Sequence, residues 1–476
     1  MGMIFAVVCA AMLGAGTPSG RGARVEEPTD GVRLAVIAPE SLRGALRPYL
    51  TFKRERLTVV DVALEDVLRS SPGVDDAERL KVWLFEAWKA GRITHVLLVG
   101  DADVMPVRYM VLDRVTPEAF DYAFYPSDMY YADVAKPDGS FDDWNGRKDG
   151  FHARYFGEVR GEKNKSDPIN YDGVDYRPEL AVGRWPVSSA DEVSIVAAKT
   201  MAAERHVGDL RAGFVMAGGW VDARPAFDRL GRALPAGWLW SRCYYAGDGG
   251  EPGPSPADLR HVIELLNGRA SLIVHAGHGN DDVWEGCLSV GDLVRVHNES
   301  APAVMISAGC STAPFSTLPP YEPYEDADGH EHGGTNAGEV FTEPRPPPSC
   351  YARGRYNRTG LGEQLLRAGP GGAAAYIGCT TGSQPCALTL EEGFVGTLAS
   401  LGRPRVGDCW AGALRHYYDR EHLATITPTP DWYPASVFFQ GMKFILFGDP
   451  TLPLPSVSWD RVAGGFGPVD EQHAWP

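Results

Sequence analysis

The sequence predicts an α/β protein built around a doubly wound, parallel β-sheet. Compact apolar runs, typical of strands covered on both faces, alternate with longer segments in which apolar residues recur at helical spacing. Glycine and proline separate these segments, as expected between helices and strands. The 476 residues, 44 % of them hydrophobic, suffice for a large core and for more than one domain.

The first alternating block begins at residue 32. Its apolar runs predict strands at 32–39, 58–64 and 94–101, and the segments between them predict helices at 41–57 and 75–91. A strand–helix–strand–helix–strand series of this kind favours parallel strands joined by crossover helices.

Residues 102–180 are rich in Tyr, Asp, Asn and Gly and show little periodicity, so we expect long loops there. A strand is predicted at 179–187 and a helix at 188–206. Ser189 and Glu192 have the spacing of a capping box, which supports the predicted start of this helix.

A second alternating block fills the rest of the chain. Ser255, followed by Pro256, marks the start of its first helix. A segment at about 317–352, rich in Pro, Gly and acidic residues, is predicted to be an inserted loop. The predicted strands are 212–220, 271–276, 301–309, 371–378 and 443–454, and the predicted helices are 255–268 and 359–369.

The chain divides into four parts. We expect a signal peptide at 1–23, a first α/β subdomain with Asp-, Tyr- and Gly-rich loops at 24–187, a second subdomain at 188–456 and a C-terminal tail at 457–476. The signal peptide is predicted by the apolar run 3–15, although no Lys or Arg precedes it. We therefore expect export by a bacterial-type route, to the cell envelope, the periplasm or the medium. No segment predicts a transmembrane helix.

Charge and cysteine content narrow the classes of partner. The net charge of −17 and the pI near 5.2 argue against binding to nucleic acid or to an anionic membrane surface. Removal of Cys9 with the signal peptide leaves seven of the eight cysteines, an odd number, so at least one thiol stays unpaired. No Cys/His spacing indicates a structural zinc site.

Two consecutive apolar strands end in reactive side chains. SLIVHAGHG delivers His278 and AVMISAGC delivers Cys310, and parallel neighbours place their carboxyl ends at one edge of a sheet. A Cys–His pair is the minimum for covalent acyl transfer, because the thiolate attacks while the imidazole moves protons. The amides of Gly279 and Cys310 are candidates for the oxyanion hole, and Asp222, which follows a predicted strand, is a candidate to orient His278.

Competing residues lie close to this pair. His275 falls within the apolar strand and is interpreted as a hydrogen-bonded core residue. Cys379 is the serious competitor for nucleophile, because it also follows an apolar strand. Ser307 and Ser311 are weaker candidates, since no GxSxG motif surrounds either.

An apolar block ending in His-Gly, a spacer and an apolar block ending in Cys together resemble the caspase-like cysteine peptidases. GHGNDDVW, with Trp284 six residues after the histidine, is similar to the gingipain branch. The resemblance covers about residues 32–454. Further matching segments are HVLLVGDADVMPV (95–107), YPSDMYYADV (125–134), ELAVGRWPV (179–187) and ILFGDPTLPL (445–454).

The resemblance implies a cysteine endopeptidase that acts on polypeptides through a thioacyl-enzyme and requires no cofactor for its chemistry. His278 and Cys310 would form the dyad in the second, catalytic subdomain, with the Gly279 and Cys310 amides as oxyanion donors. The implied fold is a caspase-like α/β/α sandwich with mostly parallel sheets in two side-by-side subdomains. Gly309 stands before the cysteine where a bulkier small residue is common. The insertion falls where gingipains build part of their primary specificity pocket, so no specificity residue carries over.

An acidic, glycine-bearing loop is a candidate site for structural Ca²⁺, because carboxylate and amide oxygens suit this ion. Its spacing is not that of an EF-hand. His330 and His332, in the insertion, are interpreted as part of a polar loop. The candidate calcium ligands are Asp138, Asp142, Asp143, Asn145 and Asp149, with Glu158 nearby.

Two other functions remain open. A transpeptidase or sorting enzyme would use the same dyad and resolve the acyl-enzyme with an amine instead of water. An inactive surface-binding module on this fold is the alternative outside enzymes, and the intact dyad argues against it. Oligomeric state and cleavage-site preference have no signal in the sequence.

Overall fold

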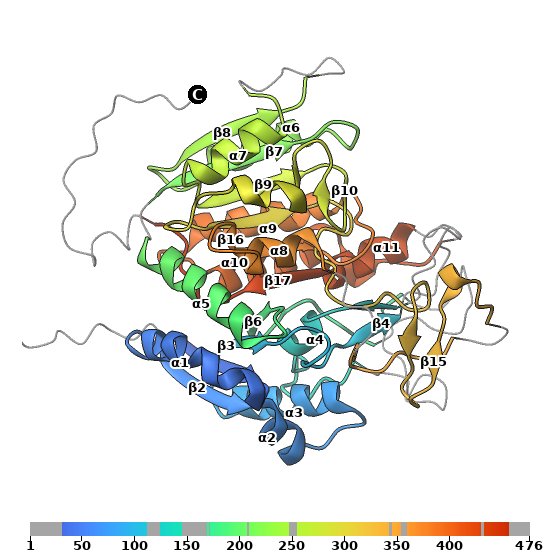
Figure 1. Cartoon of the computed structure of the whole chain (residues 1–476). Coiled ribbons are helices and arrows are strands. Elements are labelled where there is room, and N and C mark those ends of the chain that lie inside the picture. Colours follow the sequence, from blue (N-terminus) through green and yellow to red (C-terminus); the bar gives the residue numbers. More distant parts are fainter. Residues whose placement is uncertain are drawn as a thin grey trace, which may run out of the picture. The chain divides into compact units, whose positions relative to one another are not determined.

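A ten-stranded sheet runs through the described part of the chain (Figure 1). Its strands, in spatial order, are β2 (Thr58–Ala63), β1 (Arg33–Ala38), β3 (His95–Val99), β6 (Ala181–Trp185), β17 (Phe444–Gly448), β16 (Ala373–Cys379), β13 (Ala303–Ser307), β9 (Leu272–Ala276), β7 (Arg211–Met216) and β8 (Leu239–Tyr244). The computed structural model describes residues 31–111, 124–144, 169–170, 172–206, 209–246, 255–341, 345–353, 359–429 and 433–456.

Strand direction divides this sheet into two halves. The strands from β2 to β17 are all parallel, and so are those from β16 to β8, but β16 and β17 pair antiparallel. The carboxyl ends of the two halves therefore lie at opposite edges of the sheet. This mixed, mostly parallel sheet between helices confirms the predicted α/β class.

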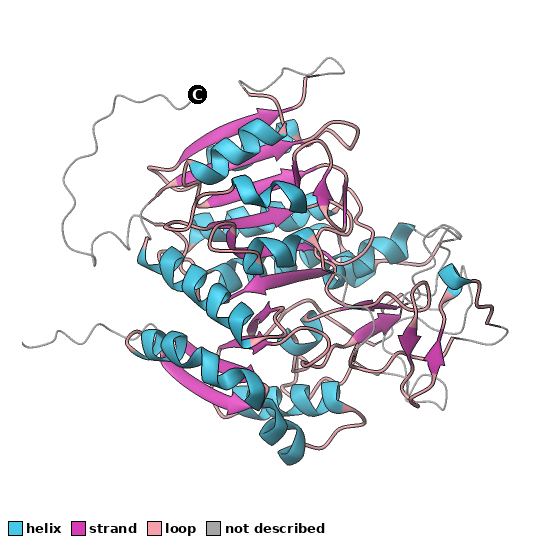
Figure 2. Ribbon diagram, in the orientation of Figure 1, coloured by secondary structure: helices cyan, strands magenta, loops and turns pink. Residues whose placement is uncertain are grey.

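Helices cover both faces of the sheet (Figure 2). Leu34 and Val36 of β1 pack into one hydrophobic layer with α1, α5, α7 and α8, while Ala35 and Ile37 pack into the other with α2, α3, α6, α9 and α10. The helices are α1 (Glu40–Arg54), α2 (Leu64–Ser70), α3 (Asp76–Lys89), α4 (Met129–Ala132), α5 (Ala190–Arg205), α6 (Arg224–Ala233), α7 (Leu259–Asn267), α8 (Leu361–Arg367), α9 (Ala387–Ser400), α10 (Val406–Arg420) and α11 (Tyr433–Gln440).

Two predicted helix starts have different outcomes. The capping box of α5 is confirmed: the Ser189 side chain accepts the amide of Glu192, and the Glu192 side chain accepts the Ser189 amide. The start of the helix predicted at 255–268 is wrong, because α7 begins at Leu259. Asp258 is the N-cap, and its side chain accepts a hydrogen bond from the His261 amide. Aspartate is as favourable as serine at this position, and Ser255 lies too far before the helix to cap it.

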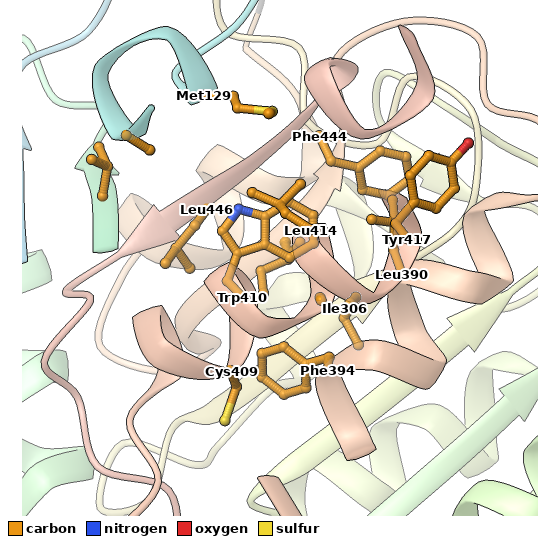
Figure 3. Close-up of a cluster of buried hydrophobic side chains, with 14 of the residues drawn as sticks. Met129, Ile306, Leu390, Phe394, Cys409, Trp410, Leu414, Tyr417, Phe444 and Leu446 are labelled. Atoms are coloured by element: carbon orange, nitrogen blue, oxygen red, sulfur yellow. The ribbon is translucent and has the colours of Figure 1, made fainter. Parts of the chain in front are cut away.

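A cluster of apolar side chains joins the two halves of the sheet (Figure 3). Ile306 comes from β13 in the second half and Leu446 from β17 in the first. Phe394 of α9 and Trp410 and Leu414 of α10 cover them from one face. The antiparallel junction between β16 and β17 is therefore buried under a shared core. Strand β17 belongs to the first half of the sheet, although its residues fall in the predicted second subdomain, 188–456. The predicted domain boundaries stay predictions.

Residues of three motif segments take part in two buried ion pairs. The carboxylate of Asp128 accepts two hydrogen bonds of 2.8 Å from the Arg184 guanidinium, whose side chain is fully buried. Directly after β17, the carboxylate of Asp449 forms an ion pair with the Lys53 ammonium at 2.8 Å, and both side chains are again buried. These polar residues thus hold the first half of the sheet together.

The insertion at 317–352 carries short structure of its own. Strands β14 (Tyr324–Glu325) and β15 (Glu331–His332) form a hairpin, and β4 (Tyr109–Val111) pairs with β5 (Phe124–Pro126) beside it. The Phe124 amide donates to the Pro319 carbonyl, which ties the start of the insertion to this second hairpin. The remaining short elements are β10 (Gly279–Asn280), β11 (Val283–Trp284), β12 (Leu288–Ser289), η3 (Val290–Arg295), η4 (Thr335–Ala337), η5 (Leu423–Thr425) and η6 (Gly441–Lys443).

His332 is the charged centre of the insertion hairpin. Its ring nitrogens lie 2.9 Å from Asp326 Oδ2 and 3.0 Å from Glu339 Oε1, and the Tyr324 ring stacks on it at 4.7 Å. Burial lowers the pKa of His332, but the hydrogen bonds to the two carboxylates outweigh this and leave it raised. The pKa values of Asp326 and Glu339 are lowered in spite of burial, through their hydrogen bonds to His332.

We expect the hairpin at 324–339 to be pH-dependent. A raised histidine pKa stabilises the fold below about 6.5 and loses that contribution as pH rises through the folded value. The measurement is hydrogen exchange over 324–339 at pH 6 and pH 8, corrected for the intrinsic rate, with protection falling at the higher pH. In His332→Gln the difference should vanish, and an undiminished difference would contradict this assignment.

Among the described residues, no helix has both the length and the apolar character required to cross a lipid bilayer. The predicted signal peptide at 1–23 and the predicted tail at 457–476 both lie outside the described residues.

Candidate active site

His278 and Cys310 follow neighbouring strands at matched positions. In the parallel pair of β9 and β13, His275 lies opposite Ser307, and each candidate residue lies three positions further on. Paired strands run about 4.8 Å apart. The segments that follow β9 and β13 therefore leave the sheet side by side, at the same carboxyl edge. His278 is exposed and Cys310 half-buried, so both are accessible.

Two glycines let the histidine and cysteine segments touch. A Cβ atom on Gly279 would lie 3.0 Å from the Cys310 carbonyl oxygen and 2.6 Å from Thr312 Cγ2. A Cβ atom on Gly309 would lie 3.2 Å from the Gly277 carbonyl oxygen. Backbone therefore packs directly on backbone here, which accounts both for glycine after the histidine and for glycine before the cysteine.

The His278 ring is held by a backbone carbonyl. Its Nε2 lies 2.7 Å from the oxygen of Gly219, which follows β7, the other neighbour of β9. A carbonyl oxygen only accepts, so Nε2 carries a proton, and in the neutral ring Nδ1 keeps its lone pair. The ring is thus oriented in the tautomer that leaves Nδ1 free to act as a base.

The Cys310 sulfur meets the loop that follows β16. The Ser383 amide donates to Sγ at 3.3 Å, and Sγ lies 3.5 Å from the Ser383 carbonyl oxygen. One residue thus offers a donor for the thiolate and an acceptor for the thiol. Within the described ranges, no hydrogen bond joins Sγ to the His278 ring, and the Cys310 amide donates none, so this N–H is open to a ligand.

Exposure separates Cys310 from its competitor. Cys379 is fully buried in β16, and burial raises the pKa of its thiol to about 12. Cys350 is partly exposed, but burial of its thiol likewise raises the pKa to about 12. Both environments disfavour the thiolate that nucleophilic attack requires. The seven cysteines of the described residues are all free thiols.

His275 is a core residue, as predicted. Its ring is buried, stacks on Trp284 with centroids 4.1 Å apart, and lies 2.9 Å from Ser307 Oγ through Nδ1. Burial lowers the pKa of His275 to about 3, so it stays neutral. Trp284 in turn donates from Nε1 to the Tyr376 hydroxyl at 3.0 Å. This layer supports the strand ends from which His278 and Cys310 project.

Asp222 does not orient His278 in this structure. Its carboxylate accepts from Arg224 Nε at 2.8 Å and from Nη2 at 2.9 Å, and the Gly219 carbonyl takes the position at the His278 ring. Asp222 turns to Arg224 because this guanidinium, two residues away, offers it two charge-assisted hydrogen bonds. The hydrogen bond to Arg224 lowers the pKa of Asp222.

Asp222→Asn is therefore expected to change kcat/KM of any hydrolytic activity by less than about threefold, because its carboxylate pairs with Arg224 and not with the His278 ring. Steady-state assay beside a His278→Ala variant provides the comparison. A loss as large as that of His278→Ala would restore Asp222 to the orienting role.

The predicted calcium loop is described only in part. Asp138 accepts hydrogen bonds from Ser140, while Asp142 is buried and accepts the Trp144 amide. Within the described ranges no group of three or more His, Cys, Asp or Glu side chains is arranged to hold a metal ion. Asn145, Asp149 and Glu158 lie outside those ranges. The calcium site, with Asp143 as one of its candidate ligands, therefore stays a prediction.

Two groups that contact the His278 and Cys310 side chains, and one buried lysine behind them, escaped sequence reasoning. The Gly219 carbonyl and the Ser383 amide are backbone atoms, which any residue supplies, and only their positions after β7 and β16 hinted at them. Lys443 is fully buried behind the Ser383 loop, with Nζ 3.4 Å from the Gly382 carbonyl oxygen. A lysine at the start of a predicted strand gave no sign that it would lie beside this loop.

A family model and several solved structures are similar to this chain. The model of peptidase family C25 matches residues 27–455. The crystal structure of the Arg-specific cysteine proteinase gingipain R is similar with a TM-score of 0.58 and 16 % identity, covering 90 % of this chain and 79 % of that one. The complex of RgpB pro- and mature domains from Porphyromonas gingivalis gives 0.57 and 15 %, covering 89 % and 79 %. No curated protein matches. The chain belongs to peptidase family C25, a family of cysteine peptidases.

Proposed function

We propose that the chain is a cysteine endopeptidase that cleaves polypeptides through a thioacyl-enzyme on Cys310, with His278 as the proton carrier. The observation that carries the proposal is the matched position of the two residues beyond the His275–Ser307 pair, with their segments in backbone contact. Membership of a cysteine peptidase family and the burial of Cys379 support it.

In the proposed mechanism, His278 carries the proton at each step. Nδ1 of His278 takes the thiol proton, and the thiolate attacks the carbonyl carbon of the scissile bond. The amides of Cys310 and Gly279 are the proposed donors to the tetrahedral oxyanion. The imidazolium then protonates the leaving amine, the C–N bond breaks, and a thioester remains on Cys310. Water that loses a proton to His278 hydrolyses the thioester and releases the free thiol.

Export and calcium binding are further proposals. The apolar run at 3–15 supports export, and the oxygen-rich loop around Asp142 supports a structural calcium site. Neither enters the chemistry above.

Covalent labelling tests the proposed nucleophile. A peptidyl acyloxymethyl ketone should modify the wild-type protein once, at Cys310, and Cys310→Ala should remain unmodified by intact-mass analysis. Cys379→Ala is the matched control and should label as the wild type does. Labelling that survives Cys310→Ala and disappears in Cys379→Ala would overturn the assignment.

The same preparation distinguishes hydrolysis from transfer. Incubation with a cleavable peptide and an added amine should yield hydrolysed products, identified by mass spectrometry. A ligated product as the main species would assign the chain to the transpeptidases, although the dyad would be unchanged.

A further inference from the structure

We propose that Lys443 stabilises the thiolate of Cys310 through the peptide group that joins Gly382 to Ser383. The oxygen of this peptide group faces the Lys443 ammonium, 3.4 Å from Nζ. Its N–H donates to Cys310 Sγ at 3.3 Å. Ammonium, peptide and sulfur are thus connected in a chain of hydrogen bonds that contains a single peptide group.

The physical effect is polarisation. A cation at the carbonyl oxygen draws electron density away from the amide nitrogen, which makes its N–H a stronger donor to a negative sulfur. The effect is largest where solvent is excluded, and Lys443 is 5 % exposed. A neutral thiol gains less from the same donor, so the arrangement favours the thiolate selectively.

The antiparallel junction of the sheet puts Lys443 in this place. Phe444, the first residue of β17, pairs with Cys379, the last of β16, so Lys443 lies beside the loop that follows Cys379. The amide and hydroxyl of Thr380 both donate to the Lys443 carbonyl, at 2.9 and 3.0 Å. The lysine backbone and the loop are therefore fixed to each other independently of the side chain.

Three thiols face Lys443, together with the Tyr125 ring, whose centroid lies 6.0 Å from Nζ. Burial lowers the pKa of Lys443, while Cys379, Cys386 and Cys310 act in the opposite direction and favour its charged form. Burial likewise raises the pKa of Cys379 to about 12 and that of Cys386 to about 11. Since these two sulfurs are buried and Cys310 is half-exposed, Cys310 is the thiol whose reactivity the ammonium governs. On the other side, His278 is the titratable residue that follows the neighbouring strand β9.

The inference rests on the proposed function, because it assigns a thiolate to Cys310, but its test does not use peptidase activity. The readout is the rate of Cys310 alkylation by iodoacetamide as a function of pH, followed by mass spectrometry of the Cys310 peptide. Lys443→Met should move the midpoint of this profile upward by about one pH unit, a tenfold slower reaction on the rising limb. Lys443→Arg, which keeps the charge, should leave it within about 0.3 unit of the wild type.

Two further variants separate charge from folding. Lys443→Gln retains an N–H donor without charge and should show the upward shift of Lys443→Met; it also carries the test if the methionine variant fails to unfold cooperatively. Lys199→Met is the matched control, since Lys199 is also buried and donates to a carbonyl, that of Leu365 at 2.9 Å. Its midpoint should equal that of the wild type.

The possible results separate the role of Lys443 from the proposed peptidase function. A wild-type profile in which Cys310 reacts no faster at neutral pH than an ordinary exposed cysteine would overturn both. A reactive Cys310 whose midpoint is the same in wild type, Lys443→Met and Lys443→Gln would overturn the role of Lys443 alone. An equal shift in Lys199→Met would reduce Lys443 to a structural residue.

Discussion

Replacement of Cys310 by alanine is expected to reduce peptidase activity to the level without enzyme, a loss of about 10⁴-fold or more. Alanine offers no nucleophile, so the thioester cannot form, while the half-buried position tolerates the smaller side chain. The measurement is kcat/KM on a peptide mixture that the wild type cleaves, with thermal unfolding to show that the variant is folded.

Loss of His278 should act on the same step. His278→Ala is expected to lower kcat/KM by about 10²–10⁴, the usual contribution of a general acid–base. Because the two side chains act as a unit, the double variant should be no less active than Cys310→Ala alone. A His278→Ala variant with wild-type activity would show that the two residues do not share one site.

Asp128→Ala is expected to destabilise the protein by about 3–5 kcal/mol, because it leaves a buried guanidinium without its anion. Arg184 is fully buried and donates to both oxygens of Asp128, and its remaining hydrogen bonds reach only the Gly100 and Pro106 carbonyls. Urea unfolding at equilibrium gives the change in the free energy of unfolding.

An exposed ion pair provides the control. Arg177 and Asp419 lie 2.9 Å apart with side chains 50 % and 62 % exposed, so Asp419→Ala should cost less than about 1 kcal/mol. Equal effects of Asp128→Ala and Asp419→Ala would contradict the view that the motif residues of the first half have a structural role.

The parts of the fold that sequence predicted are those with local signals. The apolar runs of β1, β3 and β9 are buried along their whole length, and each was predicted. The capping box at Ser189 was found because both of its residues lie within one turn. By contrast, β8, with its exposed Leu239, was missed because its apolar pattern is short. The helices α6, α9 and α10 were also not predicted.

The sequence did not predict which strands, far apart along the chain, become neighbours in the sheet. Nothing local indicates that β17 enters the sheet between β6 and β16 and runs against β16, because this is decided by packing of the shared core. The same holds for the candidate site. His278 and Cys310 carry side-chain signals and were predicted, whereas the Gly219 carbonyl and the Ser383 amide act through the backbone.

The most direct test of the account is a crystal structure of the protein after reaction with a peptidyl acyloxymethyl ketone. We predict a covalent bond from Cys310 Sγ to the inhibitor, the inhibitor oxygen within hydrogen-bond distance of the Gly279 and Cys310 amides, and the His278 ring beside it. An inhibitor bonded to another cysteine, or a His278 ring turned away from the adduct, would contradict the account.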